Sequence, residues 1–275
     1  MPSTSSPAAR THGGARRAAH SPAMHVLARA GLVARGVIYI LIGWVAILVA
    51  VGRSAREADQ AGALQLLAGK SYGLVSLWLL GIGFVAYALW RFSEAAFGVA
   101  GEGNGAGPRL KSLARGIVYA ALAYLTFQVI AGVHSNEATK QQDATASIMH
   151  HAGGRWLVGI IGLIIVVAGV ALIAQGIRRK FMRQLETSRM TRRERRIVKW
   201  LGVIGTIARG VVFALAGVLV IDAAVTYTPS KARGVDGALN ALRNQPFGEF
   251  LLLLAALGLL IFGIYGLCEA RWRRV

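Results

Sequence analysis

The chain is poor in the residues that disulfides, metal sites and catalytic centres use. Cys268 is the single cysteine among 275 residues, so the chain cannot form an internal disulfide. Asp and Glu number 12 against 31 Lys and Arg. The sequence has no nucleotide-binding glycine loop, no zinc-spaced His/Cys set and no nucleophile arranged with a base and an acid. We therefore expect a protein that is not an enzyme and that holds no cofactor and no metal.

Charge is also missing from five long stretches, which are residues 36–52, 74–90, 116–136, 156–177 and 250–268. About 20 apolar residues of helix cross the hydrocarbon core of a bilayer. The sequence predicts six spans. Each odd-numbered span includes an Arg near one end, which is acceptable because the long Arg side chain can reach the headgroups. The six spans are approximately residues 31–52, 73–91, 113–133, 156–177, 202–225 and 249–268. The predicted fold class is an all-α integral membrane protein.

The net charge of +19 is concentrated in alternate loops. Segment 178–199 holds ten Lys and Arg against two Glu, and the chain before Gly36 holds five Arg and no acid. Loops 53–72 and 134–155 are balanced. Because positive loops stay in the cytoplasm, we expect both termini and loops 92–112 and 178–199 to be cytoplasmic in a bacterial inner membrane. This distribution favours contact with anionic lipid headgroups, at 178–199 and the N-terminal tail, over nucleic-acid binding.

A motif of Ala-Arg-Gly, followed three residues later by Tyr or Phe, occurs at residues 34–39, 114–119 and 208–213. Each copy opens one apolar run and is followed by a second. The chain thus predicts three parallel two-helix repeats, because every repeat has an even number of spans. We place a disordered basic tail at 1–26 and the repeats at 27–98, 99–181 and 182–275. A pseudo-threefold bundle is expected, and a linear row of hairpins is the alternative.

Small residues recur seven positions apart in the predicted spans, for example Gly36/Gly43 and Gly162/Gly169. Such spacing puts them on one helix face, where close backbone approach lets helices associate in lipid. An Asp precedes a short apolar stretch between the two spans of each repeat. These residues, Asp59, Asp143 and Asp236, are expected to cap short external helices. Thr191 and Glu194 have the spacing of a capping box and predict the start of the fifth long helix.

The thrice-repeated Ala-Arg-Gly motif, with Gly-Ala-Leu and a glycine-led second helix in copies one and three, resembles domain of unknown function 1206. The resemblance covers about residues 27–270, although copy two lacks the Gly-Ala-Leu. It implies a bacterial inner-membrane protein with three tandem two-helix repeats. The family has no established activity, so the resemblance implies no mechanism.

The motif arginines are the first candidates for a site, and they are Arg35, Arg115 and Arg209. The second helix of each repeat ends at an aligned polar residue, and these are Glu94, Gln175 and Glu269. Three interpretations follow. The arginines could bind an anion or a lipid phosphate, they could anchor each helix at the membrane surface, or Arg35–Glu94 and Arg209–Glu269 pairs could lock their hairpins.

Apart from scattered Ser and Thr, Asp222 and Gln128 are the polar residues at mid-depth in the predicted spans. An intramembrane carboxylate is a candidate ion site, but Asp222 lies near the end of its span, where a solvated position is the alternative. The leading functional hypothesis is a non-enzymatic membrane module that interacts with lipids or with an unidentified protein partner. The alternative is a small transporter or channel for a solute or ion.

Overall fold

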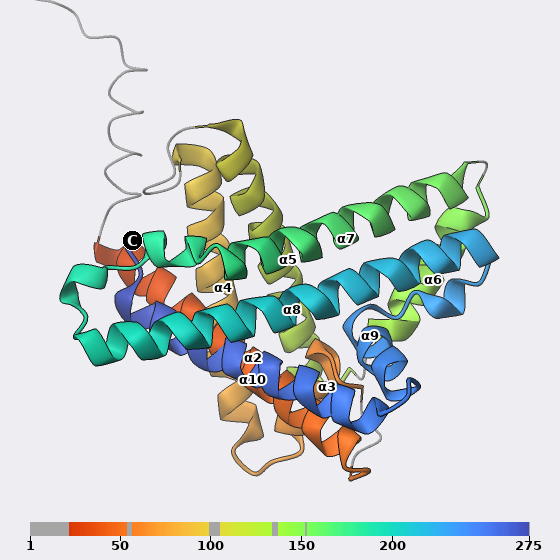
Figure 1. The fold of residues 1–275 in the computed structure, drawn as a ribbon, viewed down its shortest axis with the longest axis horizontal. Coiled ribbons are helices and arrows are strands. Elements are labelled where there is room, and N and C mark those ends of the chain that lie inside the picture. Colours follow the sequence, from red (N-terminus) through yellow and green to blue (C-terminus); the bar gives the residue numbers. More distant parts are fainter. Residues whose placement is uncertain (1–21, 54–56, 99–104, 134–136, 152, 275) are drawn as a thin grey trace, which may run out of the picture.

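The computed structural model describes residues 22–53, 57–98, 105–133, 137–151 and 153–274. Six long helices dominate the fold (Figure 1), and each is long and apolar enough to cross a membrane. They are α2 (Pro22–Ala50), α4 (Gly73–Phe97), α5 (Ala106–Ile130), α7 (Gly154–Ile177), α8 (Arg192–Thr226) and α10 (Gly248–Trp272). The predicted fold class, an all-α membrane protein with six spanning helices, is confirmed.

Two helix starts follow from local sequence signals. Pro22 begins α2, and proline suits the first helical position because the helix needs no N–H there. The helix thus includes residues 22–26, which we had placed in the disordered tail; the rest of that tail lies outside the described residues. At α8 the capping box is present, since the Thr191 hydroxyl accepts from the Glu194 backbone N–H and the Glu194 carboxylate accepts in return.

Short helices connect the two spans of each repeat. They are α3 (Gln60–Ala68), α6 (Glu137–Met149) and α9 (Gly234–Arg243). Asp59 caps α3 as predicted, with its side chain accepting from Gly62 N at 2.9 Å. The prediction is wrong for Asp143 and Asp236, which lie inside α6 and α9. Asp236 instead accepts from the backbone N–H of Ala58 at 3.1 Å and so joins the third repeat to the first.

The long helices associate chiefly across repeat boundaries. The three extensive pairs are α4–α5, α7–α8 and α10–α2, so the second helix of each repeat packs on the first helix of the next. The α10–α2 pair returns from the last repeat to the first, as a closed bundle requires and a row of hairpins does not. Figure 1 shows α7 beside α8, with the α4–α5 pair crossing their direction. Among the described residues, α5 and α7 form no comparable interface, although they belong to one repeat.

Small residues form these seams, as the spacing predicted, but between repeats. A Cβ built on Gly36 would lie 2.9 Å from the carbonyl oxygen of Gly263, and one on Gly169 would lie 2.7 Å from that of Gly210. Neither position can therefore carry a side chain without separating the backbones. The motif alanine faces the other way, because Ala34 Cβ lies against Gly83 of its own hairpin.

The two ends of the bundle differ in their residues. Short 3₁₀ turns, η1 (Lys180–Gln184) and η2 (Thr187–Arg189), connect α7 to α8 at the same end as the C-terminus. There Glu186 N donates to Trp272 O at 2.8 Å. We call this the basic end. The opposite end carries α3, α6, α9 and a third turn, η3 (Pro229–Lys231).

Candidate functional site

A buried ion pair at the basic end joins the first and last long helices. Arg35 Nη2 of α2 lies 2.5 Å from Glu269 Oε2 of α10, and Glu269 also accepts from Arg273. The predicted Arg35–Glu94 and Arg209–Glu269 pairs are therefore wrong. The physical reason is that α2 packs closely on α10, which brings Glu269 of the third repeat to the arginine of the first.

Glu94 belongs to a second buried cluster on α4 and α5. Its carboxylate accepts from Arg91 Nη1 at 2.6 Å and from the Ser112 hydroxyl at 3.0 Å. The Arg91 guanidinium also donates to the Tyr87 hydroxyl at 2.6 Å, and its centre lies 4.2 Å from the Trp90 ring centroid. Each charge in this cluster therefore has an opposite charge or a hydrogen-bond partner, as burial in a membrane requires.

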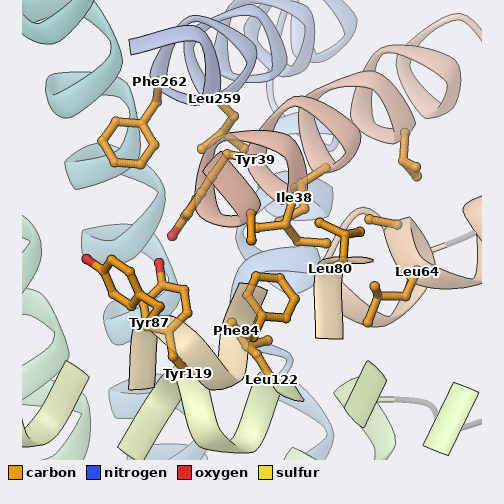
Figure 2. Close-up of a cluster of buried hydrophobic side chains, with 14 of the residues drawn as sticks. Ile38, Tyr39, Leu64, Leu80, Phe84, Tyr87, Tyr119, Leu122, Leu259 and Phe262 are labelled. Carbon is orange, nitrogen blue, oxygen red and sulfur yellow. The ribbon is translucent and has the colours of Figure 1, made fainter. Parts of the chain in front are cut away.

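Tyr87 connects the two clusters. Its hydroxyl accepts from Arg91 and, at 3.4 Å, from Arg35 Nη1. Figure 2 shows its ring beside that of Tyr119, with Tyr39 and Phe262 on neighbouring helices. The Tyr87 and Tyr119 ring centroids are 4.3 Å apart. The motif aromatics Tyr39 and Tyr119 thus form part of the packed layer on which the arginines rest.

Arg209 occupies a different environment from Arg35. Its guanidinium carbon lies 5.0–5.1 Å from the ring centroids of Tyr39, Phe213 and Phe262. Its buried Nε has no hydrogen-bond partner, as is also true of the Nε of Arg35, but Arg209 has no acidic partner either among the described residues. Aromatic faces attract a guanidinium and hold it in place, but they supply no hydrogen-bond acceptor in the plane of the guanidinium group. The rings thus hold the Arg209 guanidinium in place, and its N–H groups can still donate hydrogen bonds to a ligand.

A cavity of about 80 Å³ brings the motif arginines together at the basic end. By the same measure a single water needs only about 10–15 Å³. Among its lining residues are Arg35, Arg115, Gln175, Arg209, Glu269 and Arg273. Five of the six sequence-predicted residues therefore meet there, while Glu94 lies beside the cavity in the Arg91 cluster.

Positive charge exceeds negative charge around this cavity. Arg35 and Arg273 share the carboxylate of Glu269, whereas no described acidic residue pairs with Arg115 or Arg209. A guanidinium makes two parallel hydrogen bonds to a phosphate or carboxylate. Chemically, the cavity is suited to hold a small oxyanion.

Sequence reasoning missed Arg91, Arg273 and Tyr87. Arg91 and Arg273 looked like ordinary positive charges at helix ends, and one aromatic residue in an apolar helix carries no signal. A usable signal did exist, because Arg91 precedes Glu94 by three residues on a helix, which puts the two side chains on one face.

The remaining candidates lie outside this site. Asp222 forms an ion pair with Lys231 of η3 at 2.7 Å, and its side chain is 42% exposed. Gln128 donates to the Tyr124 hydroxyl and accepts from Lys140, also at the surface. Both belong to the end opposite the arginines. No group of three His, Cys, Asp or Glu suited to a metal ion occurs within the part of the chain that the structure describes.

Comparison with known proteins places this architecture in a family. Domain of Unknown Function (DUF1206) matches residues 30–98, 110–179 and 204–273, one match for each repeat. The chain belongs to this family. Each match covers one pair of spans, and the resemblance seen in the sequence is confirmed.

A relative of this DUF1206 protein is the uncharacterized protein YxxB of Bacillus subtilis (strain 168). The two are 32% identical over 250 residues, which cover 90% of each chain. No solved structure matches the chain. Neither the family description nor the relative's name assigns an activity.

Proposed function

We propose that this protein is a non-enzymatic membrane module that binds the phosphate group of an anionic ligand in the arginine cavity. One observation carries the proposal: Arg115 and Arg209 line the same cavity as the Arg35–Glu269 pair, and neither has an acidic partner among the described residues. Clustered positive charge without counter-charge is unfavourable in a membrane protein. A bound oxyanion would relieve that repulsion.

A lipid headgroup is the source of phosphate that the geometry favours. Arg115 is exposed on α5, and α5 packs on α4 and α3 and not extensively on α7. The side of the cavity that carries Arg115 is therefore the side on which the two helices of the second repeat separate. A phospholipid could place its phosphate there from the adjoining leaflet, whereas free phosphate would offer the same chemistry from the water phase.

Native mass spectrometry of protein released gently from membranes tests the proposal. The informative variant is Arg115→Gln/Arg209→Gln, because it leaves the Arg35–Glu269 pair intact. Lys111→Gln/Arg274→Gln is the matched control, since it removes two exposed charges from the same end and leaves the basic segment 178–199 unchanged. We expect a phospholipid adduct on wild type and control that is lost from the informative variant.

The alternatives give distinct results. A small phosphate adduct in place of a phospholipid, again lost from the informative variant, would assign the cavity to the free anion. Equal adducts on all three proteins, or no adduct on any, would overturn the proposal and direct attention to a protein partner.

We also propose that the basic end faces the cytoplasm of a bacterial inner membrane. The support is the clustering of segment 178–199 and the C-terminus at one end, together with the positive-inside rule. A reporter fused after Val275 that fluoresces only in the cytoplasm is expected to be fluorescent. A dark but stably expressed fusion would reverse the orientation.

A transporter is the second candidate. Phe213, on which Arg209 is stacked, lines a hollow of about 420 Å³ at the opposite end. Phe213 thus lies between this hollow and Arg209, which lines the arginine cavity, as a closed pathway between the two would require. Phosphate uptake into proteoliposomes that rises on Phe213→Ala substitution would favour transport, and no uptake by either protein would dismiss it.

A further inference from the structure

The larger hollow has a different character from the arginine cavity. It measures about 420 Å³, within the ~300–1,000 Å³ usual for small-molecule sites. It lies between α7 and α8. Residues of α3, α6 and α9 surround the end of the hollow that is farther from the arginine cavity, which we call its outer end. Nothing in the mechanism proposed for the arginines uses it.

Apolar side chains form two walls of this hollow. Val158, Ile161 and Ile165 line it from α7, and Phe213, Ala216 and Val220 line it from α8. Each set follows positions i, i+3 and i+7, which lie on one helix face, so one face of each helix is turned toward the hollow. Seven residues of helix rise about 10 Å. The hollow is therefore a slot that follows the helices into the membrane, with Phe213 at its inner end.

Polar groups occur at the outer end of the slot. Gln60 of α3 and Gln141 and Thr145 of α6 line it there. No Lys, Arg or His is among its described lining residues, and Asp59, the one charged residue that lines it, already accepts from Gly62 N. The described lining residues at the outer end thus offer amide and hydroxyl groups and no positive charge.

We infer that this slot binds an uncharged, single-chain amphiphile. The apolar chain would lie between the α7 and α8 walls, and a hydroxyl or amide head would bond to Gln60 and Gln141. An anionic head is disfavoured because it would lie near Asp59 with no cation among the described lining residues. The inference does not depend on the arginine cavity, which has the opposite electrostatic preference and lies at the other end.

The test uses photoreactive dodecanol, with the chain carrying a diazirine, added to the protein in nanodiscs. Labelled peptides are then mapped by mass spectrometry. Ile161→Trp should fill the slot, whereas Ile164→Trp is its matched control, because Ile164 is 61% exposed on the same helix and does not line the slot. We expect dodecanol to label α7 and α8 along the slot, and we expect Ile161→Trp to reduce that labelling about tenfold while Ile164→Trp does not.

A second pair of variants tests the inference independently of whether Ile161→Trp folds. Ala144→Trp projects into the slot from the exposed surface of α6, and Ser147→Trp lies on the same helix outside the slot. Loss of labelling in Ala144→Trp alone supports the inference. Equal labelling of all variants, or labelling by dodecyl phosphate as strong as by dodecanol at the same peptides, would overturn it.

Discussion

Arg35 and Glu269 are 234 residues apart in sequence and form an ion pair of 2.5 Å across the α2–α10 interface. Both side chains are at most one-tenth exposed. This pair joins the first repeat to the last, so the bundle is closed by a buried electrostatic contact as well as by helix packing. Arg35 and Glu269 also line the arginine cavity, so the same two residues contribute to the stability of the fold and to the candidate site.

We expect Glu269→Gln to destabilise the protein strongly. Removing one member of a buried ion pair leaves the other uncompensated and costs about 3–5 kcal/mol, and here Arg35 and Arg273 both lose their carboxylate. The measurement is the thermal midpoint in detergent. Glu249→Gln, an exposed position on the same helix, is the control. Similar midpoints for the two variants would show that the ion pair does not hold the bundle closed.

The packing of α7 on α8 predicts that Gly→Ala changes the stability of the protein differently at two glycines of α7. A Cβ on Gly169 would lie 2.5 Å from Ala214 N and 2.7 Å from Gly210 O, both backbone atoms. Gly169→Ala should therefore lower the thermal midpoint, with a cost of about 1–3 kcal/mol. At Gly159 the nearest atom would be 3.9 Å away, so Gly159→Ala should be neutral or slightly stabilising. A tolerated Gly169→Ala would contradict the α7–α8 seam.

The aspartates between the spans differ in their contacts although they occupy related places in the repeats. Asp236 is buried and accepts from Ala58 N, Arg233 and Asn240, whereas Asp143 is exposed. Asp236→Ala should lower stability by about 1–3 kcal/mol, because it leaves buried donors unsatisfied. Asp143→Ala serves as the repeat-matched control in the same thermal assay. Equal midpoints would argue against the link between α9 and the chain before α3.

The capping box predicts a local effect at the start of α8. Thr191→Ala removes the acceptor for Glu194 N and should cost about 1 kcal/mol. Hydrogen exchange of the amides in the first turn of α8 should accelerate, while exchange in the apolar part of the helix stays unchanged. Thr187→Ala, in the same connecting segment, should leave both unchanged. Unaltered exchange in Thr191→Ala would mean that the cap does not limit fraying.

Much of the architecture could be read from the sequence because it depends on local signals. Uncharged runs are long enough to span a bilayer, the Ala-Arg-Gly motif marks each repeat, and Thr191 with Glu194 marks a helix start. Small residues seven apart indicated which helix faces approach closely. None of these signals depends on which other helix lies opposite.

The partner of each helix was decided only by the tertiary structure. Spacing along the chain suggested that Arg35 would meet Glu94 of its own hairpin, but packing of α2 on α10 brought Glu269 to it. Two residues of one motif also face different neighbours, because Ala34 faces Gly83 of its own hairpin while Gly36 faces Gly263 of another repeat.

The sequence by itself determined that this protein has six spans in three repeats, because hydrophobicity and repetition are properties of the chain. Only the tertiary structure decided that Arg35, Arg115 and Arg209 share one cavity and that α5 separates from α7. The physical reason is that in lipid all apolar helix faces are equally well solvated, so close backbone contact and buried charge pairs, and not hydrophobicity, select the neighbours.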